Sequence, residues 1–240
     1  LLMITAMETP ARYEPKFVRD EKVKVLRAIR RLRGGDFAQD TVRGQYEGYL
    51  KEEGVPADSE TATFAALKLH VDNWRWQGVP FYLRSGKSMS CRTTQLVIQF
   101  RNPPHTLFET DNGLLEGNRL VIQVQPAEGI QLHLQTKVPD QHMRVRETDM
   151  DFRFNKLGKS MPDAYQRLLL DALNGDASLF ARSDEVEQAW EIIDPIIAAW
   201  ASPAAPPLES YPQGEWGPLS CTKWMQDQGR NWFDVCPVLH

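Results

Sequence analysis

The middle of the chain alternates apolar and polar residues in short runs, and this pattern limits the possible folds more than any other feature. Turn-rich stretches such as Arg101–Pro104 separate the runs, and no helical pattern lies between them. Consecutive strands without intervening helices pair antiparallel. Thr61–Val71 is a more ambiguous segment that we also interpret as a strand. The clearer predicted strands are Leu96–Phe100, Arg119–Val124, Ile130–Gln135 and Asp149–Phe154.

A helical pattern precedes this predicted antiparallel sheet. Asp20 can cap a helix that runs from Glu21 to about Leu32, and Gly34–Gly35 would end it. The basic residues of this segment, Lys22 among them, fall outside its apolar stripe. A charge run of this kind usually forms a solvated helix face, which is what we expect here.

The last third of the chain is also helical in pattern. Ser160–Asp163 carries capping signals for a helix at Ala164–Leu173, and Ser183 opens another helix that Pro195 should bend or divide. Regular structure should end at Ser202–Pro207, with an aromatic-rich tail packed on the body after it. The residues predicted to line one face of the second helix are Val186, Trp190, Ile193 and Ile197. Strands followed by helices indicate an α+β fold.

Composition excludes several classes of protein. The 240 residues are 42% hydrophobic and 25% charged, with a formal net charge of -4. This is a globular composition that gives no electrostatic reason to bind nucleic acid or an anionic membrane. No apolar run approaches the roughly 20 residues that span a bilayer. Cys91, Cys221 and Cys236 are an odd number without paired or metal-type spacing, which favours a reducing compartment and hence the cytoplasm.

The chain lacks the common sequence signatures of catalysis. It has no GxGxxG turn, no P-loop, no zinc ligand set and no nucleophile elbow. Its histidines are scattered singly without an obvious acidic partner, so we interpret them as structural. We therefore assign no catalytic residue, no metal ligand and no cofactor-binding residue. The histidines are His70, His105, His133, His142 and His240.

One segment, Arg84–Arg92, has the character of a ligand site. Gly86 beside Lys87 lets the backbone approach a ligand closely, and Lys87 with Arg92 could supply positive charge to a phosphate. Basic residues in loops are more often simply solvated. The aromatic and apolar run Trp74–Leu83 before the segment favours the functional interpretation, because it would anchor the base of the loop rigidly.

Several ordered motifs make the chain resemble the C-terminal half of glucose-6-phosphate dehydrogenases over nearly its whole length. The motifs that carry the resemblance are RDEKVKVL (Arg19–Leu26), VRGQY (Val42–Tyr46), TFAALKL (Thr63–Leu69), DNWRWQGVPFYLRSGK (Asp72–Lys87), NRLVIQVQP (Asn118–Pro126), PDAYQRLLLDAL (Pro162–Leu173), LFARSDEVEQAW (Leu179–Trp190) and YPQGEWGP (Tyr211–Pro218).

This resemblance implies a large, mostly antiparallel sheet with helices on one side, formed by residues 1–240. It implies that Lys87 reaches glucose 6-phosphate, that Arg92 makes a second phosphate or sugar contact, and that Gln125 adds a hydrogen bond. In the family an N-terminal Rossmann domain binds NADP, and the histidine base and a phosphate-gripping HYLGK motif precede the part matched here. The uncapped segment Leu1–Met7 is typical of the second half of a helix. We therefore expect this chain alone to be inactive.

Some members of the family bind a second, structural NADP on the sheet. The corresponding positions lack lysine and arginine, so we expect no such site. The resemblance also implies a homodimer or a dimer of dimers formed through the sheet. Two alternatives are a stand-alone sugar-phosphate-binding or dimerisation module, and the C-terminal domain of another sugar oxidoreductase. The positions that correspond to the second NADP site are Thr93, Val97, Gln123, Gln131 and His133.

Overall fold

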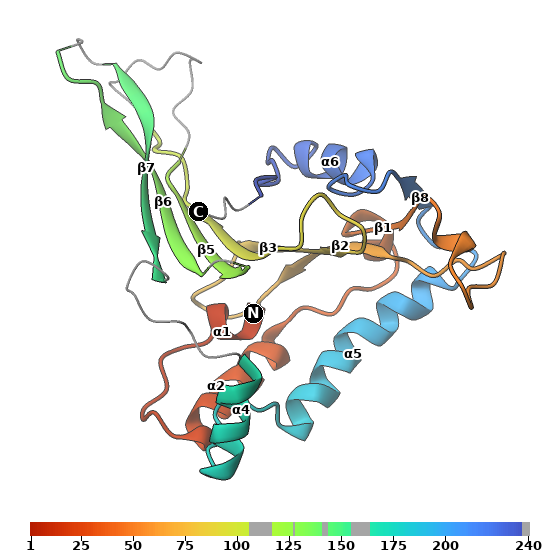
Figure 1. The fold of residues 1–240 in the computed structure, drawn as a ribbon, viewed down its shortest axis with the longest axis horizontal. Helices are drawn as coiled ribbons and strands as arrows, with labels where there is room; N and C mark the ends of the chain where they lie inside the picture. The colour runs from red at the N-terminus through yellow and green to blue at the C-terminus, as the bar shows by residue number, and fades with distance from the viewer. Residues whose placement is uncertain (106–116, 127, 141–143, 155–163, 237–240) are drawn as a thin grey trace. The chain divides into compact units, whose positions relative to one another are not determined.

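The structure is a computed structural model that describes residues 1–105, 117–126, 128–140, 144–154 and 164–236. The chain forms two compact units, the first made of residues 1–90 and 162–232 and the second of residues 91–161 and 233–240. Each unit contains a four-stranded sheet (Figure 1). The predicted α+β class with mostly antiparallel pairing is confirmed, with the strands divided between two sheets.

The first unit has the strand order β3-β2-β1-β8. The β1–β2 and β2–β3 pairs are antiparallel and the β1–β8 pair is parallel. Its strands are β1 (Thr41–Tyr46), β2 (Phe64–His70), β3 (Pro80–Gly86) and β8 (Leu208–Tyr211). Its helices are α1 (Leu2–Ala6), α2 (Pro15–Ala28), α3 (Asp36–Gln39), the 3₁₀ helix η1 (Tyr49–Lys51), α4 (Ala164–Leu173), α5 (Ser183–Trp200) and α6 (Leu219–Gln226).

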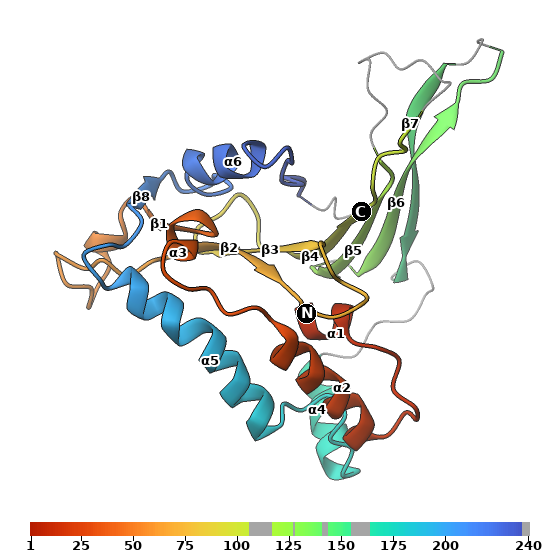
Figure 2. The same cartoon turned by 180° about the vertical axis from the view of Figure 1, so that it is seen from behind.

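Strand β2 is buried on both faces of the first sheet. Successive side chains of a strand point to opposite faces, so Phe64 and Ala66 lie on one side and Leu67 and Leu69 on the other. Phe64 and Ala66 pack in a cluster with Cys221 of α6. Leu67 and Leu69 join a cluster that includes residues of α2 and α5. Figures 1 and 2 show α6 on one side of this sheet and α2 with α5 on the other, so helices cover both of its faces and not one face as expected.

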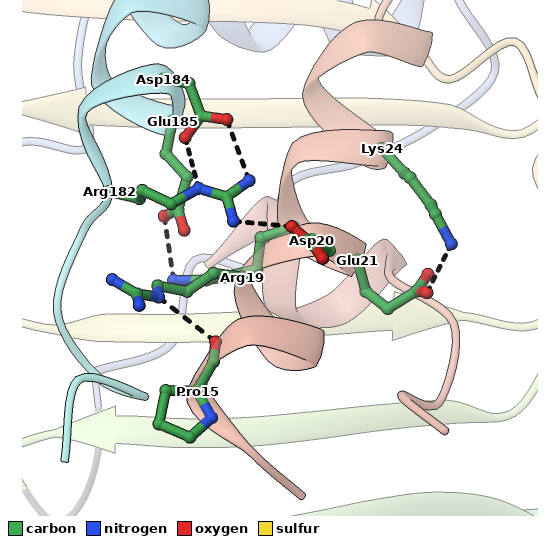
Figure 3. Close-up of polar contacts among 9 residues, drawn as sticks. Pro15, Arg19, Asp20, Glu21, Lys24, Arg182, Asp184 and Glu185 are labelled. Atoms are coloured by element: carbon green, nitrogen blue, oxygen red, sulfur yellow. Dashed lines mark hydrogen bonds and ion pairs between the residues drawn. The ribbon is translucent and has the colours of Figure 1, made fainter. Parts of the chain in front are cut away.

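Charged residues of two recognised motifs join α2 to α5 (Figure 3). Arg182 lies 2.6 Å from Asp20 and 2.6 Å from Asp184. Lys22 Nζ lies 2.9 Å from Glu185 Oε2, with the two side chains only 8% and 3% exposed. The prediction that Lys22 lies on a solvated face was therefore wrong. Asp20 is not a helix cap, because α2 begins earlier, at Pro15.

Helix α2 also ends earlier than its sequence pattern predicts. It stops at Ala28, and Ile29 is extended and forms a bridge with Val71 beyond the end of β2. The Arg30 amide then donates to the carbonyl of His70 at 2.9 Å. Pairing with the strand gives these backbone groups the hydrogen bonds that a further helical turn would otherwise supply. The helix is thus ended by a strand distant in sequence and not by Gly34–Gly35.

The predicted bounds of α4 and the start of α5 are confirmed, but the apolar face predicted for α5 is not the one that is most buried. Ile192 and Ile196 of α5 are buried, whereas Trp190 is 55% and Ile197 50% exposed. Helix α5 continues through Pro195 as one helix. The sequence of α5 contains two overlapping apolar stripes, and spacing alone does not identify the one that packs on the sheet. The predicted capping signals at 160–163 lie outside the described residues.

Regular structure continues beyond the proline-rich run at 202–207, contrary to expectation, because β8 and α6 follow it. The guanidinium of Arg43 in β1 donates to the carbonyls of Trp200 and Pro206 at 2.7 and 2.8 Å. These bonds satisfy the end of α5 and the start of the next segment, which positions β8 beside β1. Within the described residues, no helix is long and apolar enough to cross a membrane.

The second unit is an antiparallel meander with the strand order β4-β5-β6-β7. All four of its strands were predicted, although β7 begins at Val145 instead of Asp149. The strands are β4 (Thr94–Gln99), β5 (Arg119–Gln125), β6 (Gly129–Lys137) and β7 (Val145–Arg153). One face carries two rows of apolar residues paired across the four strands, with Met150 61% and Phe152 47% exposed. The rows are Leu96–Ile122–Ile130–Phe152 and Ile98–Leu120–Leu132–Met150.

The cysteines do not all remain unpaired. Cys91 and Cys236 form a disulfide within the second unit, whereas Cys221 is outside this disulfide and buried in the first. The same C-terminal segment contacts the sheet through Phe233, whose carbonyl accepts a hydrogen bond from Gln95 at 3.1 Å. Because two cysteines are paired, the argument that linked unpaired cysteines to a reducing compartment was wrong.

Candidate functional site

The candidate ligand segment Arg84–Arg92 starts within β3 and continues beyond the end of that strand at Gly86. Gly86 pairs with Phe64, and a Cβ atom built on Gly86 would lie 2.7 Å from Met89 Sδ and 2.9 Å from Phe64 Cδ2. Such contacts are too close for any larger residue without movement of the neighbours. The next amide, of Lys87, donates to the carbonyl of Thr63 at 2.9 Å. The backbone is therefore fixed directly before the candidate lysine.

The residues after Gly86 are tied to the turn that follows β8. The Tyr211 hydroxyl donates to the carbonyl of Lys87 at 2.7 Å. The Gly214 amide donates to the Ser88 carbonyl at 2.8 Å, and the Ser90 hydroxyl donates to the Gly214 carbonyl at 2.6 Å. Ser88 has a φ of 49°, an uncommon conformation that these bonds hold in place. The segment around Lys87 is thus a rigid loop with an ordered backbone.

The two cations of this loop region differ in their surroundings. The guanidinium of Arg84 lies 5.1 Å from the ring of Trp216 and 4.4 Å from that of Trp232, which engages its charge in cation–π contacts. The Lys87 side chain is exposed, and within the described part of the chain it has neither a hydrogen bond nor an ion pair. Of these two cations, Lys87 is therefore the one whose charge is available to an anionic ligand.

Arg92 and Gln125 belong to the second unit, where both are exposed. Thr94 pairs with Gln125 across β4 and β5, and the Thr93 hydroxyl donates to the Gln125 carbonyl at 3.1 Å. Arg92 and Gln125 therefore lie at the same end of one strand pair. Among the residues that the structure describes, the Arg92 guanidinium has no ion pair. Lys87 is part of the first unit.

His133 has acidic partners, so the expectation of isolated histidines was wrong for this residue. Its Nδ1 lies 2.6 Å from Asp149 and 3.5 Å from Glu147, and its ring contacts that of Phe233. These are the residues within the described ranges that could jointly hold a metal ion. A charge-assisted hydrogen bond between His133 and Asp149 accounts for the arrangement, and we assign no metal. Partial burial lowers the pKa of His70, the last residue of β2.

The positions that would hold a second NADP do not fit its phosphate. Gln123 is 5% exposed and its amide donates to Thr93 at 2.8 Å, so this side chain is already engaged. His133 faces two carboxylates, Glu147 and Asp149, which would repel a dianionic phosphate. Val97 offers no polar group.

Sequence reasoning missed Tyr211, although it lies at the start of the recognised motif YPQGEWGP. The side chain is fully buried, and its hydroxyl reaches Lys87 from a position 124 residues away in sequence. The signal that could have drawn attention to Tyr211 is the presence of a tyrosine in a glycine-rich turn motif. No local pattern indicates its partner.

The architecture defines the class of α+β domains with open, mostly antiparallel sheets, and its exposed cations at strand ends suit an anionic ligand. Within this class, the chain belongs to the family described as "Glucose-6-phosphate dehydrogenase, C-terminal domain", whose model matches residues 1–233. The family predicted from the sequence motifs is therefore confirmed.

Named relatives agree with this assignment. The chain is 44% identical to "Glucose-6-phosphate 1-dehydrogenase" of Treponema pallidum over 252 aligned residues, covering 100% of this chain and 49% of the relative. It is 40% identical to the enzyme of the same name from Dickeya dadantii, covering 98% of this chain and 50% of that protein. The chain thus spans about half the length of the curated relatives it matches.

Solved structures show the same fold. The glucose-6-phosphate 1-dehydrogenase of Mycobacterium avium superposes with a TM-score of 0.83 at 33% identity, covering 99% of this chain and 49% of that one. A structure described as glucose-6-phosphate dehydrogenase in complex with its substrate glucose-6-phosphate gives a TM-score of 0.86 at 34% identity, covering 96% and 48% of the two chains.

Proposed function

We propose that this chain is the C-terminal, substrate-binding and dimerisation part of a glucose-6-phosphate dehydrogenase. The whole enzyme would oxidise glucose 6-phosphate to 6-phosphogluconolactone with NADP, the first step of the oxidative pentose phosphate pathway. The family assignment supports this proposal, as does the neighbouring structure whose description names bound glucose 6-phosphate. NADP would be held mainly by an N-terminal Rossmann half. The proposed location is still the cytoplasm, which now rests on the family assignment and no longer on the cysteines.

The observation that carries the substrate proposal is the exposed Lys87 ammonium on a loop whose backbone is fixed on both sides. An ammonium and a guanidinium form charge-assisted hydrogen bonds with phosphate oxygens, and these are stronger than neutral ones. Lys87 and Arg92 would hold the phosphate or sugar, and Gln125 would add a hydrogen bond. A rigid loop contributes by limiting the motion that binding must otherwise suppress.

Calorimetric titration with glucose 6-phosphate tests these assignments. Lys87→Ala and Arg92→Ala should each weaken binding roughly 10- to 100-fold, because a hydrogen bond to a charged group contributes about 1.5–3 kcal/mol. Gln125→Ala should weaken it about fivefold. Lys51→Ala, which removes an exposed lysine of η1, is the matched control and should bind as the unaltered chain does. Equal affinity of the Lys87→Ala and Lys51→Ala variants would exclude Lys87 as a substrate contact.

We further propose that residues 1–240 alone do not reduce NADP. The chain has no GxGxxG turn to receive a pyrophosphate, and no histidine in it is assigned as the base. The assay compares NADPH formation by the purified chain with that of the complete product of its gene, both given glucose 6-phosphate and NADP. Turnover by residues 1–240 would contradict this proposal. A complete gene product that binds glucose 6-phosphate without turnover would favour a stand-alone binding module.

The dimer proposal rests on the apolar face of the second sheet, part of which is exposed among the described residues. Met150 and Phe152 belong to its two apolar rows and are 61% and 47% exposed. An apolar sheet face of this kind suits a second copy of the same chain, because a twofold axis brings identical patches together. Combining Met150→Asp with Phe152→Asp should convert a dimer into a monomer in sedimentation velocity. Trp74→Ser, which alters an exposed aromatic residue of the first unit, should not. A dimer that survives the double substitution would exclude this face.

The same chain is proposed to lack a second NADP. The carboxylates around His133 and the engaged amide of Gln123 support this expectation. Equilibrium dialysis of NADP against residues 1–240 should show no tight, stoichiometric binding. One tightly bound NADP per chain would contradict the proposal.

A further inference from the structure

Tyr211 lies at the end of β8, and its side chain is fully buried beneath the loop that carries Lys87. Its ring makes edge contacts with the rings of Phe64 and Tyr46, at centroid distances of 5.6 and 6.5 Å. β8 pairs in parallel with β1, which places Tyr211 opposite Tyr46. Both the backbone and the ring of Tyr211 are therefore held, so the position of its hydroxyl is fixed.

The hydroxyl of Tyr211 is a link in a hydrogen-bond chain with a defined direction. The Tyr46 amide, which can only donate, lies 2.9 Å from the Thr63 hydroxyl. The Thr63 hydroxyl lies 3.3 Å from the Tyr211 hydroxyl, which donates to the Lys87 carbonyl at 2.7 Å and lies 3.4 Å from the Thr63 carbonyl, a second and longer contact. Both carbonyls can only accept, so Tyr211 is the donor, and the shorter bond goes to Lys87. The Thr63 hydroxyl can then donate to the Tyr211 oxygen. Burial raises the pKa of Tyr211, so its hydroxyl keeps this proton at neutral pH.

We propose that Tyr211 is a positioning residue for substrate binding: its buried hydroxyl fixes the peptide plane of Lys87 and hence the point from which the ammonium reaches the sugar phosphate. The inference rests on the proposed function of Lys87 and adds a residue that does not itself touch substrate. A lysine side chain is long and flexible, so a fixed backbone is needed to limit the volume that its ammonium samples.

The Lys87 backbone is held from both sides, and the two bonds have different partners. Its amide donates to the Thr63 carbonyl at 2.9 Å, which continues the β2–β3 pairing. Its carbonyl depends on Tyr211. Removing the Tyr211 hydroxyl would leave the first bond intact and release the second. The strand end would remain in place while the peptide after Lys87 could rotate.

The test uses the protein as its gene encodes it and measures the dissociation constant of glucose 6-phosphate by calorimetry. Tyr211→Phe keeps the ring contacts and should weaken binding about fivefold, the effect of one neutral hydrogen bond. Tyr46→Phe is the matched control, because within the described residues the hydrogen-bond partner of the Tyr46 hydroxyl is the exposed side chain of Glu52, at 3.3 Å. Its affinity should not change. Thermal melts of both variants verify that they are folded.

A double-mutant cycle with Lys87→Ala separates positioning from a merely structural role. If Tyr211 acts through Lys87, the Tyr211→Phe effect should disappear in the Lys87→Ala background. An equal loss in both backgrounds, or no loss in either, would overturn the inference. Should Tyr211→Phe not fold, Thr63→Val interrupts the same hydrogen-bond chain one link earlier and should give a smaller loss that also depends on Lys87.

The cycle also separates failure of this inference from failure of the proposed function. If the unaltered protein does not bind glucose 6-phosphate, or if Lys87→Ala binds it equally well, the substrate proposal itself is wrong. If Lys87→Ala weakens binding and Tyr211→Phe does not, only the positioning role is excluded.

Discussion

Lys22 and Glu185 form a buried ion pair between α2 and α5, and removal of one partner should be strongly destabilising. The two charged atoms lie 2.9 Å apart, and the side chains are 8% and 3% exposed. At an effective dielectric constant of about 20, this separation corresponds to an attraction of about 6 kcal/mol. Desolvation of each ion costs several kcal/mol, so the intact pair contributes little net stability.

Removing one partner of the pair changes the stability far more than the small net contribution of the intact pair would suggest. Glu185 Oε1 already has no hydrogen-bond partner within the described residues, so Lys22→Met would leave the buried carboxylate wholly unpaired. A change of this kind costs about 3–5 kcal/mol. For a domain of this size, each kcal/mol lowers the melting temperature by about 2–4 °C, so we expect a decrease of roughly 6–20 °C.

Thermal unfolding followed by circular dichroism measures this effect. Combining Lys22→Met with Glu185→Met should restore most of the lost stability or exceed that of the unaltered chain, because no buried charge then remains. Lys24→Met is the control, since Lys24 pairs with Glu21 but is 69% exposed. It should hardly change the midpoint. A double variant that loses the sum of the two single losses would refute the reasoning.

Two further predictions concern charge and thiols. The Arg182 hydrogen bond lowers the pKa of Asp20, so the stability from this pair is complete above the unfolded pKa of about 4 and is lost as the pH falls through the lower folded value. Arg182→Gln should therefore reduce the fall in melting temperature on acidification; an unchanged pH dependence would contradict this. Thiol titration of the denatured chain without reductant should detect only Cys221, because Cys91 and Cys236 are paired. Three reactive thiols would disprove the disulfide.

The candidate site was partly accessible from sequence. Lys87 stood out because a glycine precedes it and an aromatic run leads into it, and these are local features. Local features also identified the four strands of the second unit, since alternation with period two depends only on neighbouring residues. The same reasoning failed for Arg84, which was expected in the loop but lies in β3 with its charge between two tryptophans.

Errors of the sequence analysis occur where a residue's partner is distant in the chain. The end of α2 was misplaced because Val71 pairs with Ile29. Lys22 was expected in solvent because its partner, Glu185, lies on another helix. Helix propensity and charge patterning describe a segment in isolation, and tertiary contacts override both.

The sequence by itself determined the family, the α+β class, the limits of α4 and the strands of the second sheet, because ordered motifs and short-range periodicity encode them. Only the tertiary structure decided which stripe of α5 is buried, which cysteines pair and which hydroxyl holds Lys87. Tyr211 and Lys87 are separated by 124 residues. Their contact follows from the parallel pairing of β8 with β1 together with the antiparallel pairing of β1, β2 and β3, which no local pattern expresses.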